Sequence, residues 1–218
     1  MRTSQSAHAV DRGTVLVRPV LGWVAIAGVA YFVLAIAYLH VLRPDVNPVA
    51  RVTSEYAVGP YGVLMTSAYF IFGCALVALG IGIARSFDTR AWTTVGTALL
   101  YLAAAATAIA GLFPIDAGAL RPITSEGRVH RLAGIVAFTS MTLGPLLLAP
   151  RFRRHRRWQD VASVGRLAGV AGLLGLAAIQ LFLLERGLAG VAQRIVLALV
   201  CAWMLLAAFR LTSKESAP

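Results

Sequence analysis

Charged residues are scarce in this sequence, which excludes an ordinary soluble globular protein. They make up 13% of the 218 residues, and apolar residues make up 59%, whereas about a quarter of the residues of a soluble domain are charged. The charges are missing from six stretches of roughly 20 residues each, a length typical of membrane-spanning helices. These stretches are 20–39, 61–84, 92–112, 129–149, 163–184 and 191–209.

The six stretches also lack the two-residue alternation that the strands of an outer-membrane barrel carry. We therefore predict an all-α membrane protein, a six-transmembrane-helix bundle. Residues 19–210 form its single domain, and residues 1–18 and 211–218 are short tails. The first stretch is long and starts after three arginines, so we interpret it as a retained helix and not as a cleaved signal peptide.

No Asp, Glu, Lys, Arg or His lies near the middle of any stretch. Ion-coupled transporters and channels usually carry such a residue at mid-membrane, or broken helices that bind there, so the absence argues against both classes. Cysteine is also scarce, and both cysteines, Cys74 and Cys201, fall inside predicted helices. They cannot close a disulfide in an outer loop, and we expect them to be small packing residues.

Basic charge is plentiful, and its distribution predicts the topology. Thirteen of the twenty Lys and Arg residues, but only four of the nine Asp and Glu residues, lie in or beside the termini and the second and fourth connectors. The positive-inside rule then places both termini in the cytoplasm, in a multi-pass protein of the cell (cytoplasmic) membrane. Because no folded basic domain is present, we expect membrane lipids as partners and no nucleic acid.

Glycines recur at short spacing in the fifth helix, where Gly165, Gly169, Gly172 and Gly175 cluster on nearby faces. Small residues at such spacing let helix backbones approach closely in lipid, where van der Waals packing replaces the hydrophobic effect. We interpret the glycines as a packing signature and not as a ligand motif. The same glycine-rich faces would also allow a homo-oligomer.

Ionisable residues gather at the predicted outer ends of the helices. Two outer connectors are long, at about 20 residues for 40–60 and about 16 for 113–128, and connections of that length are often functional. We expect them to fold over the mouth of the bundle and to bring their polar side chains to one patch. The candidate ligand-binding residues are His40, Glu55, Asp116, Glu126, Arg128, His130 and Arg131.

The preferred interpretation of this patch is a site for a lipid or another amphiphile. Arg128 and Arg131 would bind a phosphate, and the acidic candidates would bind amine or hydroxyl groups. His130 carries most weight, since it lies about one turn inside the fourth helix with Gly134 one turn deeper. That spacing leaves room beside the imidazole for a neighbouring helix or a ligand.

Three other interpretations stay open. A membrane-embedded hydrolase would use the Asp/Glu/His cluster with or without a metal, for example with His40, His130 and Asp116 as zinc ligands. A b-type haem protein would need His40 and His130 as a pair. A purely structural protein would use the same residues as a salt-bridged outer cap. We expect no metal and no cofactor, we assign no catalytic residue, and we lean away from an enzyme.

Three segments carry a resemblance to a known family: SEYAVGPYG before the second helix, GLFPID after the third and GRVHRLAG in the fourth. Over about residues 21–209 the chain resembles the bacterial and archaeal membrane proteins of domain-of-unknown-function family 998. More remotely, its layout is similar to the Frag1/DRAM/Sfk1 group, some of which are linked to lipid handling. The resemblance implies six helices and favours the lipid interpretation over haem or zinc. Its most specific matches are Ser54, Glu55, Phe113, Pro114, Asp116, Gly127, Arg128 and His130.

Overall fold

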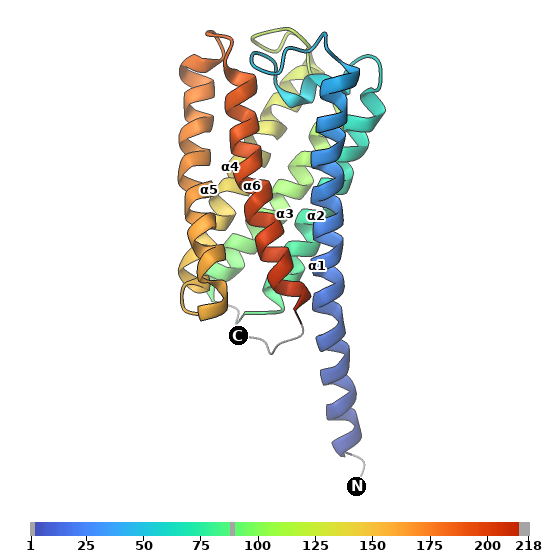
Figure 1. The fold of residues 1–218 in the computed structure, drawn as a ribbon, viewed down its shortest axis with the longest axis vertical. Coiled ribbons are helices and arrows are strands. Elements are labelled where there is room, and N and C mark those ends of the chain that lie inside the picture. The colour runs from blue at the N-terminus through green and yellow to red at the C-terminus, as the bar shows by residue number, and fades with distance from the viewer. Residues whose placement is uncertain (1–2, 88–89, 214–218) are drawn as a thin grey trace.

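Six long helices form the protein, which we describe from a computed structural model that covers residues 3–87 and 90–213 (Figure 1). Three short helical elements lie between the long ones. They are η1 (Thr53–Ala57), η2 (Arg156–Trp158) and the π-helical turn η3 (Ile179–Leu183). The long helices are α1 (Thr3–Leu42), α2 (Gly62–Ala84), α3 (Ala91–Leu112), α4 (Ser125–Phe152), α5 (Gln159–Ala178) and α6 (Ala189–Thr212).

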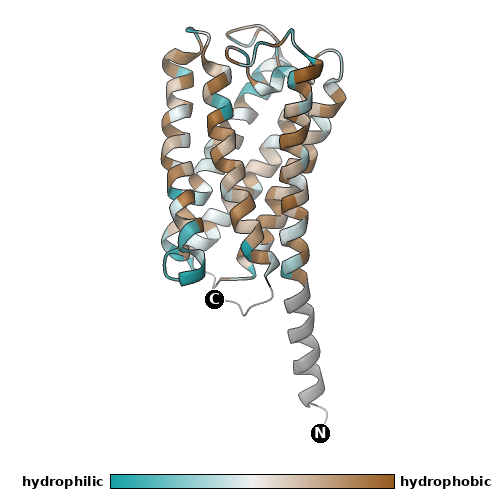
Figure 2. Cartoon of the chain, in the orientation of Figure 1, coloured by the Kyte–Doolittle hydropathy of each residue, from teal (hydrophilic) through white to brown (hydrophobic). Residues whose placement is uncertain are grey.

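The six predicted stretches are confirmed as helices, and each is long and apolar enough to cross a membrane. The observed spans begin and end within a few residues of the predicted ones, apart from the fifth, which extends back to Arg156. Apolar residues fill the middle of the bundle and polar residues gather at its two ends (Figure 2). The chain is therefore an all-α, multi-pass membrane protein.

The first helix is longer than its apolar span. Its apolar span is Val17–Leu42, but α1 itself begins at Thr3. Most of the predicted N-terminal tail thus continues the first helix, which extends beyond the other five in Figure 1. Hydropathy marks only the apolar part of a helix, so a polar helical extension cannot be recognised from it.

Successive helices alternate in direction, which gives the bundle two distinct ends. The start of α1 and the end of α6 lie at one end, which we call the termini end (Figure 1). Segments 43–61, 113–124 and 184–188 connect helices at the opposite end, which we call the loop end. The long first and second loops fold over the bundle there, as predicted from their length.

Glycines bring α5 against α4 near the middle of the bundle. A Cβ atom added at Gly169 would stand 2.6 Å from Leu146 Cβ, and one added at Gly172 would stand 2.4 Å from Thr142 Cγ2. Such distances are too short for any larger residue without a shift of the helices. The glycine spacing of the fifth helix therefore serves packing inside the chain, as predicted. A homo-oligomer through these faces stays a prediction.

Candidate functional site

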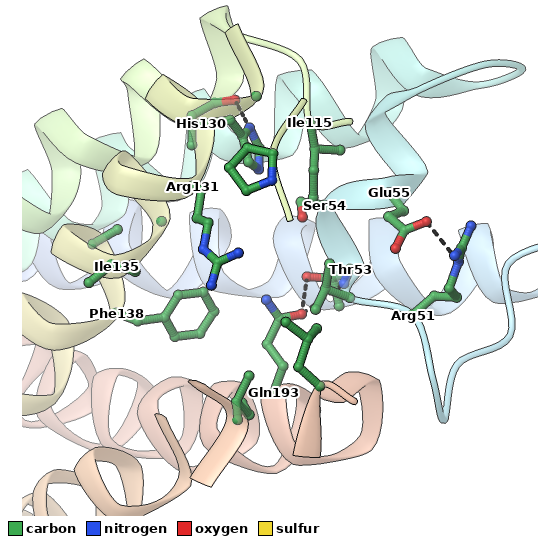
Figure 3. Close-up of a pocket in the computed structure, with 18 of the residues that line it drawn as sticks. Arg51, Thr53, Ser54, Glu55, Ile115, His130, Arg131, Ile135, Phe138 and Gln193 are labelled. Carbon is green, nitrogen blue, oxygen red and sulfur yellow. Dashed lines mark hydrogen bonds and ion pairs between the residues drawn. The ribbon is translucent and has the colours of Figure 1, made fainter. Parts of the chain in front are cut away.

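A cavity of about 280 Å³ lies inside the bundle at its loop end (Figure 3). Its roof is made by segments 50–55 and 115–122, and all six long helices contribute to its walls. On α4 the lining runs from Gly127 to Met141, a depth of about 21 Å at 1.5 Å per residue. The deeper lining is apolar and includes Phe32, Phe72, Phe138, Met141 and Leu197.

An ion pair between Glu55 and Arg51 lies at the roof. Glu55 Oε2 is 2.9 Å from Arg51 Nε and accepts a hydrogen bond of 3.1 Å from the backbone N–H of Gly118. Burial raises the pKa of the Glu55 carboxyl above its ordinary value, and the Arg51 cation and the Gly118 N–H oppose that effect. Glu55 therefore joins the first loop to the second directly over the cavity.

His130 lines the cavity and is only 5% exposed. Its Nδ1 lies 2.8 Å from the carbonyl oxygen of Phe113 and 3.0 Å from that of Ala110, so Nδ1 carries a hydrogen and donates to both. These carbonyls lie at the end of α3, where the last C=O groups of a helix have no partner within the helix. His130 thus joins α4 to α3, while its Nε2 has no hydrogen-bond partner in the described part of the chain.

Arg131 brings a positive charge into the cavity. Its Nη2 donates to Gln180 Oε1 at 2.8 Å, and its Nη1 lies 3.3 Å from the carbonyl oxygen of Leu120. The guanidinium extends from α4 toward the space between Phe138 and Gln193 (Figure 3). Within residues 3–87 and 90–213 no carboxylate pairs with it.

Asp116 closes the second loop and explains the predicted link between FPxD and G-R-x-H. Its carboxylate accepts hydrogen bonds from the backbone N–H groups of Ile123 and Thr124, at 2.7 and 3.0 Å, and from the Thr124 hydroxyl at 2.8 Å. Thr124 is the N-cap of α4, and its Oγ1 accepts from the Gly127 N–H at 2.9 Å. A Cβ atom at Gly127 would collide with Asp116 Oδ2, so a larger residue there would push the carboxylate away from its hydrogen-bond partners.

Glu126 and Arg128 point away from the cavity. Both side chains are exposed, neither lines the cavity, and neither forms a hydrogen bond or ion pair with a described residue. The helix turns about 100° per residue, so residues 126 and 128 face away from the side that 127, 130 and 131 present to the cavity. These two candidates are neighbours in the chain of residues that line the cavity, but they are not part of the lining.

His40 also lies outside the cavity lining. Its Nε2 accepts a hydrogen bond of 3.0 Å from Arg194 Nε, and its Nδ1 donates to the carbonyl oxygen of Ile36 at 2.6 Å. The Tyr56 ring lies 5.4 Å away, between centroids. Both imidazole nitrogens are therefore engaged in a network that supports the first loop.

The described residues form no ligand set for zinc. No group of three or more His, Cys, Asp or Glu side chains that could hold a metal ion occurs among the described residues. The two histidines proposed as a haem pair lie in separate surroundings, since His40 contacts Arg194 and His130 contacts the end of α3. The zinc interpretation thus finds no set of three ligands among the described residues. The haem interpretation stays a prediction.

Comparison with known proteins places the chain in a family. Residues 26–210 match the family described as Protein of unknown function (DUF998). The chain belongs to the DUF998 family. No curated protein and no solved structure matches it significantly. The family predicted from the three sequence segments is thus confirmed, and the remoter similarity to the Frag1/DRAM/Sfk1 group stays a prediction.

In this DUF998 protein the matched region contains every residue that lines the cavity. Two of these lining residues, Gln193 and Gln180, are not among the candidates predicted from the sequence. Gln193 on α6 accepts hydrogen bonds from the backbone N–H and the hydroxyl of Thr53, at 2.7 and 3.0 Å, through its Oε1. Gln180 on η3 accepts from Arg131. The only sequence signal for either glutamine is an amide near the end of an apolar helix.

We expect Asp116→Asn to lower the melting temperature of the DUF998 protein by a few degrees at pH 7. Hydrogen bonds from Thr124 and Ile123 lower the pKa of the Asp116 carboxyl. Its stabilisation is therefore present above the pKa of the unfolded chain and is lost as the pH falls through the lower pKa of the folded protein. The difference from wild type should shrink below about pH 4.

Thermal unfolding between pH 3 and pH 7 measures this effect. Glu126→Gln is the matched control, because Glu126 is exposed and has no partner among the described residues. A constant difference across that range would contradict the assigned role of the Asp116 carboxylate.

Proposed function

We propose that the protein binds a membrane lipid or another amphiphile in the loop-end cavity. The observation that carries the proposal is the distribution of polarity in the lining. Arg131, Glu55 and Gln193 lie near the roof, whereas phenylalanines and other apolar residues line the deeper part. A molecule with one polar end and one apolar end satisfies both regions, and a small polar metabolite satisfies only the first.

The size of the cavity also supports a ligand larger than water. Its volume of about 280 Å³ is close to the lower limit of ligand pockets, roughly 300 Å³. One buried hydroxyl in its lining, Thr107 Oγ1, has no hydrogen-bond partner in the described part of the chain. Buried polar atoms in proteins are nearly always paired, so this hydroxyl is a group that a ligand or a bound water would satisfy.

The proposal includes an orientation. By the positive-inside rule the termini end faces the cytoplasm of a cell membrane, which places the cavity near the outer surface. The polar roof would then lie at the level of lipid headgroups and the deeper lining at the level of acyl chains. No residue is assigned to bond cleavage, so the proposed activity is binding or handling and not hydrolysis.

Gly134→Leu tests the proposal. Gly134 lines the cavity, and a Cβ added there meets nothing within 4 Å. A larger side chain therefore starts into open space, and a leucine would occupy the space of the ligand's apolar part. We expect the amount of lipid that co-purifies with the protein to fall about tenfold, equivalent to losing contact with roughly two methylene groups at about 0.8 kcal/mol each.

Native mass spectrometry of the purified full-length protein measures the bound lipid, and thermal unfolding checks the fold. Gly134→Ala is the matched control, because one methyl group leaves most of the cavity open and alanine favours the helix. The proposal is lost if wild type carries no selective lipid, or if Gly134→Leu retains as much as Gly134→Ala.

A further inference from the structure

We propose that the ligand is a phosphate-bearing amphiphile, with its phosphate on Arg131 and its chain in the opening between α4 and α5. This inference rests on the proposed function and deepens it, because it assigns the chemistry of the polar end and the path of the apolar end. Three observations carry it: an uncompensated cation, a second donor beside it, and an apolar wall that opens between two helices.

Arg131 is the uncompensated cation. The other charges of the lining are already engaged, since Glu55 pairs with Arg51 and Asp116 accepts three hydrogen bonds within its own loop. Among the described residues Arg131 donates hydrogen bonds only to neutral oxygens, those of Leu120 and Gln180. A guanidinium presents five N–H donors in a planar fork that matches a phosphate, and two neutral acceptors leave part of the fork unused.

Gln193 supplies a second donor. Its Oε1 accepts both hydrogen bonds from Thr53, which fixes the side chain and leaves the amide NH₂ without a partner among the described residues. In Figure 3 this NH₂ and the Arg131 guanidinium face the same space above Phe138. A phosphate there would accept hydrogen bonds from α4 on one side and from α6 on the other.

The apolar path follows from the way α4 and α5 separate. The two helices contact each other closely through Gly169 and Gly172, near the middle of the bundle. Toward the loop end the backbones leave open space, because a Cβ at Gly134 meets nothing and one at Gly175 meets only Val196 of α6. There the long side chains of Arg131 and Gln180 bridge the two elements through their hydrogen bond. Small residues that pack tightly at one level and face open space at another indicate a gap at the second level.

That gap connects the cavity to the outside of the bundle. Ile135 of α4 lines the cavity and is also 40% exposed, and Gln180 of η3 lines it and is exposed as well. Leu132 and Leu181 beside them are exposed apolar side chains, which suits contact with lipid. The π-helical turn at Gln180 marks the same place, and such turns are frequent at functional sites.

Two probes that differ only in the phosphate test the proposal: 1-palmitoylglycerol 3-phosphate and 1-palmitoylglycerol. We expect the purified full-length protein to bind the phosphate-bearing probe at least about tenfold more tightly, the effect of one hydrogen bond to a charged group. Arg131→Gln should remove this difference without changing the affinity for 1-palmitoylglycerol. Arg128→Gln is the matched control, since it removes an exposed arginine three residues away and should leave both affinities unchanged.

Each outcome decides one point. Equal binding of both probes by wild type overturns the phosphate assignment and leaves the proposed function standing. This comparison uses only the wild-type protein, so it does not depend on whether any variant folds. Binding of neither probe overturns the proposed function itself. If glycerol 3-phosphate competes as well as the palmitoyl probe at equal concentration, the ligand is a free phosphate compound and the path between α4 and α5 is wrong.

Discussion

Replacing Gly190 with leucine is expected to destabilise the protein by about 3 kcal/mol, the upper end of the usual cost of overpacking. A Cβ atom there would stand 2.4 Å from the carbonyl oxygen of Arg51, 2.6 Å from that of Pro48 and 2.8 Å from that of Val49. All three atoms belong to the backbone, so no side-chain rotation can relieve the clash. The first loop would have to lift away from α6.

Lifting the first loop also removes part of the cavity roof. The neighbouring backbone N–H of Val191 donates to the carbonyl oxygen of Val49 at 3.0 Å, and this bond would be lost as well. Glu55 and Thr53 lie only a few residues further along the same loop. We therefore expect Gly190→Leu to weaken ligand binding together with stability.

Thermal unfolding in one detergent measures the change, with Gly134→Leu as the matched control. The substitution is the same in both variants and both glycines lie in helices at the loop end, but Gly134 faces open space. A melting temperature for Gly190→Leu equal to that of Gly134→Leu would contradict the close packing of α6 against the first loop.

Arg194→Met is the second substitution expected to cost about 3 kcal/mol. Arg194 donates to His40 Nε2 at 3.0 Å through Nε, and to the carbonyl oxygens of Arg51 and Gly190 at 2.8 and 3.0 Å through Nη1. Its guanidinium also lies over the Tyr56 ring, 5.9 Å from the centroid. Methionine keeps much of the side-chain volume but leaves these acceptors without their donor. A buried acceptor that loses its donor costs more free energy than the hydrogen bond itself contributes.

Arg186→Met is the control for this prediction, because Arg186 is exposed and, among the described residues, contacts only the Phe182 ring. We expect a clear loss of melting temperature for Arg194→Met and almost none for Arg186→Met. His40→Ala should reproduce only part of the loss, since it removes one of the acceptors and leaves the others paired. If Arg194→Met and Arg186→Met have the same melting temperature, the network around Arg194 does not support the first loop.

Part of the candidate site could be predicted from the sequence, and part could not. Asp116, Glu55, His130 and Arg131 were correctly placed together at one end of the bundle, because the membrane confines ionisable side chains to the helix ends. Glu126 and Arg128 lie in the same short segment and face away from the cavity. The segment contains too few apolar residues to show which face of the helix turns inward.

The roles of the histidines show the same limit. The depth of His130 in its helix and the glycine one turn below it predict a place beside a ligand, and His130 does line the cavity. The position of His40 at a helix end predicts the same, but its nitrogens contact Arg194 and Ile36. Arg194 is more than 150 residues away in the chain, and only the packing of α6 against α1 brings the two together.

The sequence alone determined the number of helices, their approximate bounds and the level at which charge is found. These properties follow from local quantities, namely the hydropathy of about twenty consecutive residues and the cost of placing a charge in hydrocarbon. The tertiary structure alone decided that α4 and α5 separate at the loop end and that Arg131 and Gln193 face one cavity. Contacts between distant helices depend on how whole side-chain surfaces fit together, and no local pattern in the chain records that fit.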